Sequence, residues 1–170
     1  VHDPDWMRWR ADKLTKVWTQ IFHTVKASNP KCLVALSPNH YQFAYDTSLQ
    51  DWQNWRQRGF IEELMVQVYR NNLDSFAAEL DRPEMEAARA HIPVGIGILA
   101  GLKSLPVPIP LIQAQVQTAR ERGFAGVSFF FYETLWRSDQ ETLDQRRTSL
   151  QQLFPTSVKR PIQDTASPVL

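Results

Sequence analysis

The sequence has little cysteine, little net charge and no long apolar run, and each lack excludes a class of protein. Its one cysteine, Cys32, cannot form an intramolecular disulfide, and we expect it to be a small buried hydrophobic residue. A net charge of +1, with basic residues dispersed among acidic ones, gives no reason to expect binding to nucleic acid. No run of about 18 apolar residues is present, so we expect no membrane span in this segment.

Motifs for metals, nucleotides and a serine nucleophile are also missing. The 4 histidines are scattered, without H-E-x-x-H or paired-cysteine spacing, so we expect no metal and no cofactor. Neither a dinucleotide nor a P-loop fingerprint occurs. Gly95-Ile96-Gly97 lies inside a predicted strand, where the glycines would leave room for a bulky neighbour. Ser37 lacks the G-x-S-x-G elbow of hydrolases.

What is present is a chain of ordinary globular composition. With 170 residues and 43% apolar content it fits one domain, or part of a larger one. We expect the folded domain to cover residues 1–154 and residues 155–170, rich in Ser, Thr and Pro, to form a tail. No signal peptide is visible, and because the chain begins with Val1 we expect the natural N-terminus to lie upstream.

The hydrophobic pattern predicts a helix followed by four βα units. The helix begins at Asp3-Pro4-Asp5 and ends at Ser28-Asn29-Pro30. The last helix is predicted to be capped by Ser138, with Glu141 as its capping-box partner, and to end near Phe154-Pro155. The predicted strands are residues 31–36, 64–69, 94–99 and 125–131. Their ends fall near Ser37, Tyr69, Gly101 and Glu133, each 32 residues after the last. Such alternation predicts an α/β fold with a parallel sheet and right-handed crossovers. Four βα units are either half of a (β/α)8 TIM-type barrel or a small open doubly wound sheet.

In both architectures, ligands bind at the carboxyl ends of the strands, which directs attention to the polar residues there. Ser37 and Asn39 follow the first strand with the same parity, so their side chains either enter one cavity or form a turn. Gln67 is a lone amide in the second strand and shares a face with Met65 and Tyr69. We expect this face to be interior, where Gln67 either binds a ligand hydroxyl or makes a structural hydrogen bond.

Five motifs in order resemble the C-terminal half of the glycosyl-hydrolase-like 10 family, most closely its cyanobacterial members. They are Ser37-Pro38-Asn39, Gln50-Asp51-Trp52-x-x-Trp55, Val66-Gln67-Val68-Tyr69-Arg70, the run 94–101 (VGIGILAG) and the run 126–132 (GVSFFFY). The resemblance covers residues 3–154 and implies parallel βα units forming strands five to eight of a (β/α)8 barrel. It further implies an extracytoplasmic cell-envelope protein that hydrolyses glycan strands, including peptidoglycan stripped of its peptides. The family's first four units have no counterpart here, so this missing N-terminal half is an expected partner, beside the polysaccharide substrate.

Glycoside hydrolysis generally uses two carboxyl groups across the scissile bond. Glu133 is the one acid directly at a predicted strand end, and we expect it to be a catalytic or sugar-binding carboxylate. The alternative is that Glu133 pairs with Arg137 or caps the next helix. Asp46, in the first predicted loop, is the second catalytic candidate, or else a turn residue before Thr47-Ser48.

Aromatic residues near the strand ends supply candidate platforms for sugar rings. Tyr41, in a predicted loop with Phe43 and Tyr45, and Trp136, after the last strand, are the platforms that we expect. The remaining substrate-binding candidates at the strand ends are Tyr69, Arg70 and Tyr132. Two other functions stay open: a glycan-binding module without catalysis, and a structural half that functions only with its missing half.

Overall fold

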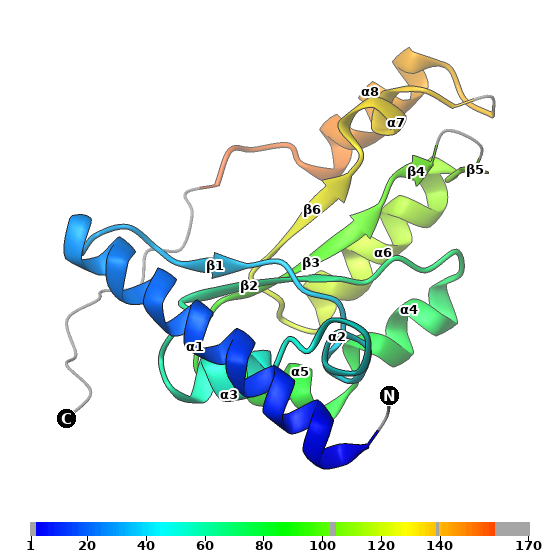
Figure 1. Ribbon diagram of the computed structural model, residues 1–170. Coiled ribbons are helices and arrows are strands. Elements are labelled where there is room, and N and C mark those ends of the chain that lie inside the picture. The colour runs from blue at the N-terminus through cyan, green and yellow to red at the C-terminus, as the bar shows by residue number, and fades with distance from the viewer. Residues whose placement is uncertain (1–2, 103–104, 139, 159–170) are drawn as a thin grey trace.

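The computed structural model describes residues 3–102, 105–138 and 140–158 (Figure 1). The helices are α1 (Pro4–Ser28), α2 (Tyr41–Ser48), α3 (Trp52–Gln57), α4 (Leu73–Leu80), α5 (Pro83–Arg89), α6 (Ile109–Glu121), α7 (Tyr132–Trp136) and α8 (Leu143–Leu153). The main sheet consists of β1 (Ala35–Leu36), β2 (Glu63–Gln67), β3 (Val94–Leu99) and β6 (Gly126–Phe130). A separate hairpin is formed by β4 (Gly101–Leu102) and β5 (Leu105–Pro106).

All neighbours in the main sheet are parallel, in the order β1-β2-β3-β6. The strands end at Leu36, Gln67, Leu99 and Phe130, so a new strand ends every 31 or 32 residues. A helix returns the chain between successive strands, as parallel pairing requires. The predicted α/β class and parallel sheet are therefore confirmed, and the arrangement is consistent with part of a TIM-type unit.

Helices cover one face of this sheet and leave the other face without a helix among the described residues (Figure 1). Strand residues that alternate toward the helices are buried, as Leu64, Val66 and Ile96 illustrate. On the opposite face Met65 and Gln67 are half-buried, and Phe130 keeps 40% of its surface exposed. The face that carries Gln67 is thus the open face of the sheet.

Two glycines on this open face lie beneath large side chains, and at Gly95 the neighbour needs the Cβ atom to be absent. A Cβ atom on Gly95 would lie 2.5 Å from Cε of Met65, and one on Gly97 would lie 3.6 Å from Cε1 of Tyr69. Both glycines are buried although no helix covers them, because these two neighbours do. The expectation that a glycine leaves room for a bulky neighbour is confirmed at Gly95, whereas a Cβ atom on Gly97 would meet Tyr69 at ordinary van der Waals distance.

Helix α1 packs on the helical layer through tryptophans. Its start is as predicted: the carboxylate of Asp3 accepts a hydrogen bond from the backbone N–H of Trp6 at 2.8 Å. Farther along, Trp55 of α3 donates from Nε1 to Oγ1 of Thr15 at 2.8 Å. The rings of Trp55 and Trp18 stack with their centroids 5.1 Å apart. Helix α1 therefore belongs to the same core as the sheet.

Several local expectations are wrong, each for a physical reason. Cys32 is exposed, because a turn follows α1 and the strand starts only at Ala35. Residues 41–48 form a helix and not a loop, because Tyr41 and Tyr45 share one side of it and the small Ala44 is buried against its neighbours. Helix α8 is capped by Thr142 with Gln145 and not by Ser138.

The region after β3 contains elements that the sequence did not predict. Helix α7 and the β4–β5 hairpin lie where only loop was expected. The predicted tail is described only to residue 158, without helix or strand, and its remainder lies outside the described residues.

Candidate functional site

The ends of β1 and β2 bring three candidate residues together. Asn39 forms a parallel bridge with Gln67, whose backbone N–H donates to the carbonyl of Pro38 at 2.8 Å. The Gln67 side chain donates from Nε2 to the backbone carbonyl of Ser37 at 2.8 Å and approaches its Oγ at 3.4 Å. The structural hydrogen bond considered for Gln67 is thus present. Within the described part of the chain its Oε1 accepts no hydrogen bond, so this oxygen remains able to accept one from a hydroxyl.

The ends of β2 and β6 meet on the open face through two rings. Tyr69 stacks on Phe130 with centroids 5.3 Å apart and an interplanar angle of 12°. Burial raises the pKa of the Tyr69 phenol, so it stays a neutral hydrogen-bond donor near neutral pH. Phe130 is a residue that the sequence reasoning left unassigned, although its position at a strand end could have indicated it. The strand ends therefore converge, as the parallel topology predicts.

A cleft of about 990 Å³ lies beyond the end of β6, between α7, α8 and the β4–β5 hairpin. Its lining includes three candidates from the sequence, Tyr132, Glu133 and Trp136. Tyr132, which is 79% exposed, meets the Trp136 ring edge to face at 6.2 Å. Nε1 of Trp136 is buried and has no hydrogen-bond partner among the described residues. The cleft thus offers aromatic surface from Tyr132 and Trp136, beside an indole N–H that is buried without a partner among the described residues.

Two carboxylates line this cleft, and they differ in their hydrogen-bond partners and in their exposure. Glu133 is 69% exposed at its side chain and pairs with Arg137 at 2.7 Å, which is the alternative that the sequence left open. Glu141 accepts from the backbone N–H of Ile109 and from Nη1 of Arg146, both at 2.9 Å. Burial works against ionisation of Glu141, but these bonds outweigh it and the pKa is lowered. Glu141 is therefore an ionised anchor, and the sequence reasoning missed it because it took this glutamate for part of a helix cap.

Asp46 and Tyr41 lie on α2, outside the cleft beyond β6. Asp46 is exposed and accepts from Nε2 of Gln42 at 2.8 Å, one helical turn away. Tyr41 donates its hydroxyl to Asp51 at 2.8 Å, and Arg8 of α1 pairs with the same carboxylate at 2.7 Å. Burial first, and then the bond to Asp51, raises the pKa of Tyr41 far above its ordinary value. In this arrangement Tyr41 joins α1, α2 and the start of α3.

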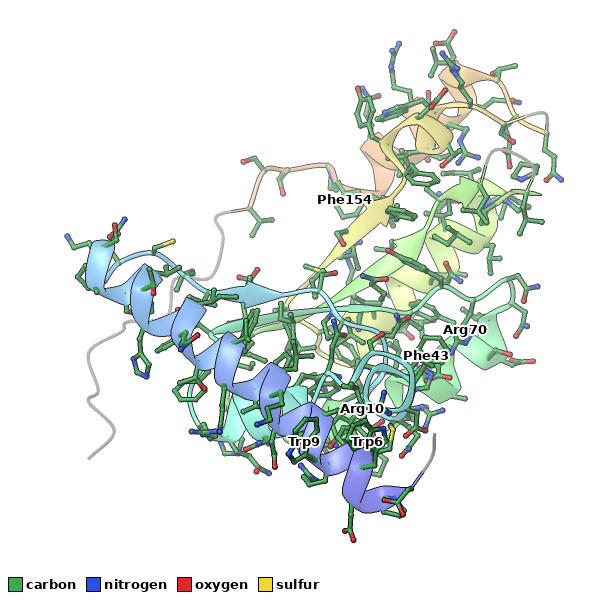
Figure 2. The ribbon with its side chains drawn as sticks, in the orientation of Figure 1. Trp6, Trp9, Arg10, Phe43, Arg70 and Phe154 are labelled. Atoms are coloured by element: carbon green, nitrogen blue, oxygen red, sulfur yellow. The ribbon has the colours of Figure 1, made fainter. Side chains whose placement is uncertain are left out.

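Arg70, which follows β2, belongs to an ionic cluster at the same end of the sheet (Figure 2). It donates to Glu79 of α4 at 2.7 Å and to its neighbour's backbone carbonyl at 3.0 Å, and Arg82 also pairs with Glu79. His40, just after Asn39, lies near enough to this cluster to interact electrostatically with Glu79. Burial lowers the pKa of the His40 imidazole. Two arginines on one glutamate leave this part of the rim with positive charge.

The Glu79 cluster predicts a pH dependence of stability. Burial opposes ionisation of Glu79, but hydrogen bonds from Arg82 and Arg70 outweigh it, so its pKa lies below 4.5 in the folded protein. A lowered pKa stabilises the fold above the unfolded value, and this stabilisation is lost as the pH falls below about 4.5. We expect the difference in unfolding free energy between wild type and Glu79→Gln, measured by urea denaturation, to shrink from pH 7 to pH 4. The exposed Glu86→Gln is the control, and a difference that stays constant with pH would contradict the expectation.

Within the described residues, no three histidine, cysteine, aspartate or glutamate side chains converge in a way that could hold a metal ion. None of the described helices combines the length and the apolar character needed to cross a bilayer.

Parallel βα units, an open sheet face and polar and aromatic residues at the strand ends define an α/β protein whose architecture is consistent with part of a TIM-type unit. The chain matches the model of the glycosyl hydrolase-like 10 family over residues 1–119, which is more than half of its length. It therefore belongs to this family, as the motifs at the strand ends indicated. No curated protein and no solved structure matches the chain.

Proposed function

We propose that the chain is the C-terminal half of a (β/α)8 barrel that hydrolyses glycan strands of the bacterial cell envelope, in particular peptidoglycan stripped of its peptides. In this proposal β1, β2, β3 and β6 are strands five to eight, and four preceding units complete the barrel. The protein acts outside the cytoplasm. Glu133 is a catalytic carboxylate in the cleft, and the strand-end residues Gln67 and Trp136 contact the sugar.

The open face of the sheet carries this proposal. In a closed barrel the helices lie outside, while the inner face carries the side chains that meet the substrate. Helices cover one face here, and the other presents small, polar and aromatic residues such as Gly97, Gln67 and Phe130. Both edge strands, β1 and β6, have one neighbour each in the main sheet. Four more parallel strands would pair with both edges and close the barrel.

A glycan-binding module without catalysis is the second candidate, and the state of the carboxylates favours it. Glycosidases hold two carboxyl groups roughly 5–10 Å apart around the scissile bond. Here Glu133 pairs with Arg137, both oxygens of Glu141 accept hydrogen bonds, and Asp46 lies on α2. In the hydrolase proposal, therefore, the second carboxyl group comes from the four preceding units.

Turnover of peptide-free glycan strands by the whole natural protein tests the proposal. We expect Glu133→Gln to lower kcat by about 100-fold or more, because general acid–base catalysis contributes at least that much. Gln67→Ala should raise KM by about three- to tenfold, the effect of one lost hydrogen bond. Release of short glycan products, followed by chromatography, measures both.

Asp144→Asn is the matched control, since that carboxylate is 91% exposed on α8. Binding of strands without any release of products would support the module instead. Full turnover in Glu133→Gln would remove this glutamate from the catalytic site.

A further inference from the structure

A second hollow lies on the helical side of the molecule, where α1 and α3 run next to each other. This groove has a volume of about 620 Å³ and shares no residue with the cleft beyond β6. On α1 it extends from Trp9 to Gln20, about 17 Å at the usual helical rise. Asn54 and Arg58, at and just beyond α3, form its other side. The groove is long enough to accommodate several sugar rings in a row.

The lining of the groove is basic. Lys13, Lys16 and Arg58 contribute three positive charges and Asp12 one negative charge. In the part of the chain that the structure describes, none of these three cations forms an ion pair. The whole chain has a net charge of only +1, so this concentration of unpaired positive charge is local. Such a surface attracts an anionic ligand.

An aromatic pair stands at one end of the groove. Trp9 stacks on Trp6 with centroids 5.0 Å apart and yet remains 52% exposed (Figure 2). The ammonium of Lys13 lies 4.7 Å from the centre of the Trp9 ring, so charge and aromatic surface are adjacent. Large exposed rings are unusual without a partner, and indoles bind well to ligands that have both apolar and polar sides.

The groove is close to the strand ends through the contacts of α1. Arg8, one residue before Trp9, pairs with Asp51, which begins α3 and binds the hydroxyl of Tyr41 after β1. The Trp9 end of the groove therefore adjoins the rim on which the strand ends converge. A polymer that occupies the strand-end site has a short route along this rim to the groove.

We propose that the groove between α1 and α3 binds a carboxylate-bearing segment of a long glycan strand, as a remote subsite of the proposed hydrolase. Removal of the peptides from peptidoglycan leaves a free carboxylate on each lactyl ether, where an amide stood before. The three cations are complementary to these carboxylates, Trp9 to a sugar face, and the amides of Gln20 and Asn54 to hydroxyl groups. The groove thus selects peptide-free strands, and this inference rests on the proposed function.

Direct binding, measured with fluorescent peptide-free glycan strands and the whole protein, tests this subsite separately from catalysis. We expect Lys13→Gln/Lys16→Gln to weaken binding by about three- to tenfold, as the loss of two exposed ion pairs implies. Trp9→Ala should weaken it by a similar factor. The pair Lys31→Gln/Arg147→Gln removes the same charge elsewhere on the surface and should leave binding unchanged.

Chemical variants of the ligand make the test specific. Strands whose carboxylates are methyl-esterified should bind more weakly to wild type and equally well to wild type and Lys13→Gln/Lys16→Gln. Equal binding of native strands by this variant and its control would overturn the subsite, while turnover of short oligosaccharides would still support the hydrolase. Tighter binding of a single-stranded oligonucleotide than of the glycan, lost in the same variant, would also overturn it.

Discussion

Replacement of Arg146 by alanine is expected to lower the free energy of unfolding by about 3–5 kcal/mol. The guanidinium has no exposed surface and donates to the carbonyls of Leu135 and Val107 and to the carboxylate of Glu141. Removal of the arginine leaves these acceptors unpaired and Glu141 charged in a site that is only 15% exposed. Urea denaturation followed by circular dichroism measures the loss.

Two further variants separate the charge from the volume of Arg146. The double variant Arg146→Met/Glu141→Gln should recover part of the loss, because it restores apolar volume and leaves no unpaired charge. Arg147→Ala, at an exposed neighbouring position, should change stability by less than about 0.5 kcal/mol. Equal effects of Arg146→Ala and Arg147→Ala would mean that the buried network does not hold α7 and α8 together.

Replacement of Trp55 by alanine is expected to cost about 3–5 kcal/mol as well, the range for a large aromatic residue in a core. Trp55 is only 2% exposed, stacks on Trp18 and donates to Thr15, so its loss opens a cavity between α1 and α3. Thermal and urea denaturation both measure the effect.

Phenylalanine at position 55 should give an intermediate loss, because it fills part of the cavity but leaves Thr15 without the indole donor. Trp9→Ala, which removes the same side chain from an exposed site, should cost less than about 1 kcal/mol. Similar losses for Trp55→Ala and Trp9→Ala would contradict the packing of α1 described here.

The sequence predicted the sheet well because strand and helix periodicity report burial directly. Val94–Leu99 was predicted with its observed bounds, and all six of its residues are buried. The strand prediction was wrong for residues 31–34, because an apolar run such as Cys32-Leu33-Val34 has the pattern of a strand whether or not it pairs with one. Cys32 is exposed just after a turn, Val34 is buried, and the strand starts only at Ala35. Short elements such as α7 failed because one helical turn has too few residues for a period.

The sequence predicted those parts of the candidate site that depend on backbone positions in the strands. It did not predict the parts that depend on contacts between side chains. Strand parity placed Ser37, Asn39 and Gln67 at one edge, and their hydrogen bond and bridge agree with that. Nothing in the sequence spacing indicates that Glu141 would be held by Arg146 or that Tyr69 would stack on Phe130. Both contacts join residues that are adjacent only after folding.

The tryptophan contacts of α1 determine where this protein could be divided. If each βα unit is taken to begin with its strand, the boundary of the first unit lies after Ser28, at the end of α1. A chain cut there would lack α1, so Trp55 of α3 would lose its hydrogen bond to Thr15 and its stacking on Trp18. The indole ring of Trp55 would then be exposed to solvent. The family match, which starts at residue 1, includes the helix as well. As a unit of recombination or of expression, this parallel sheet therefore has to keep α1, the element ahead of its first strand.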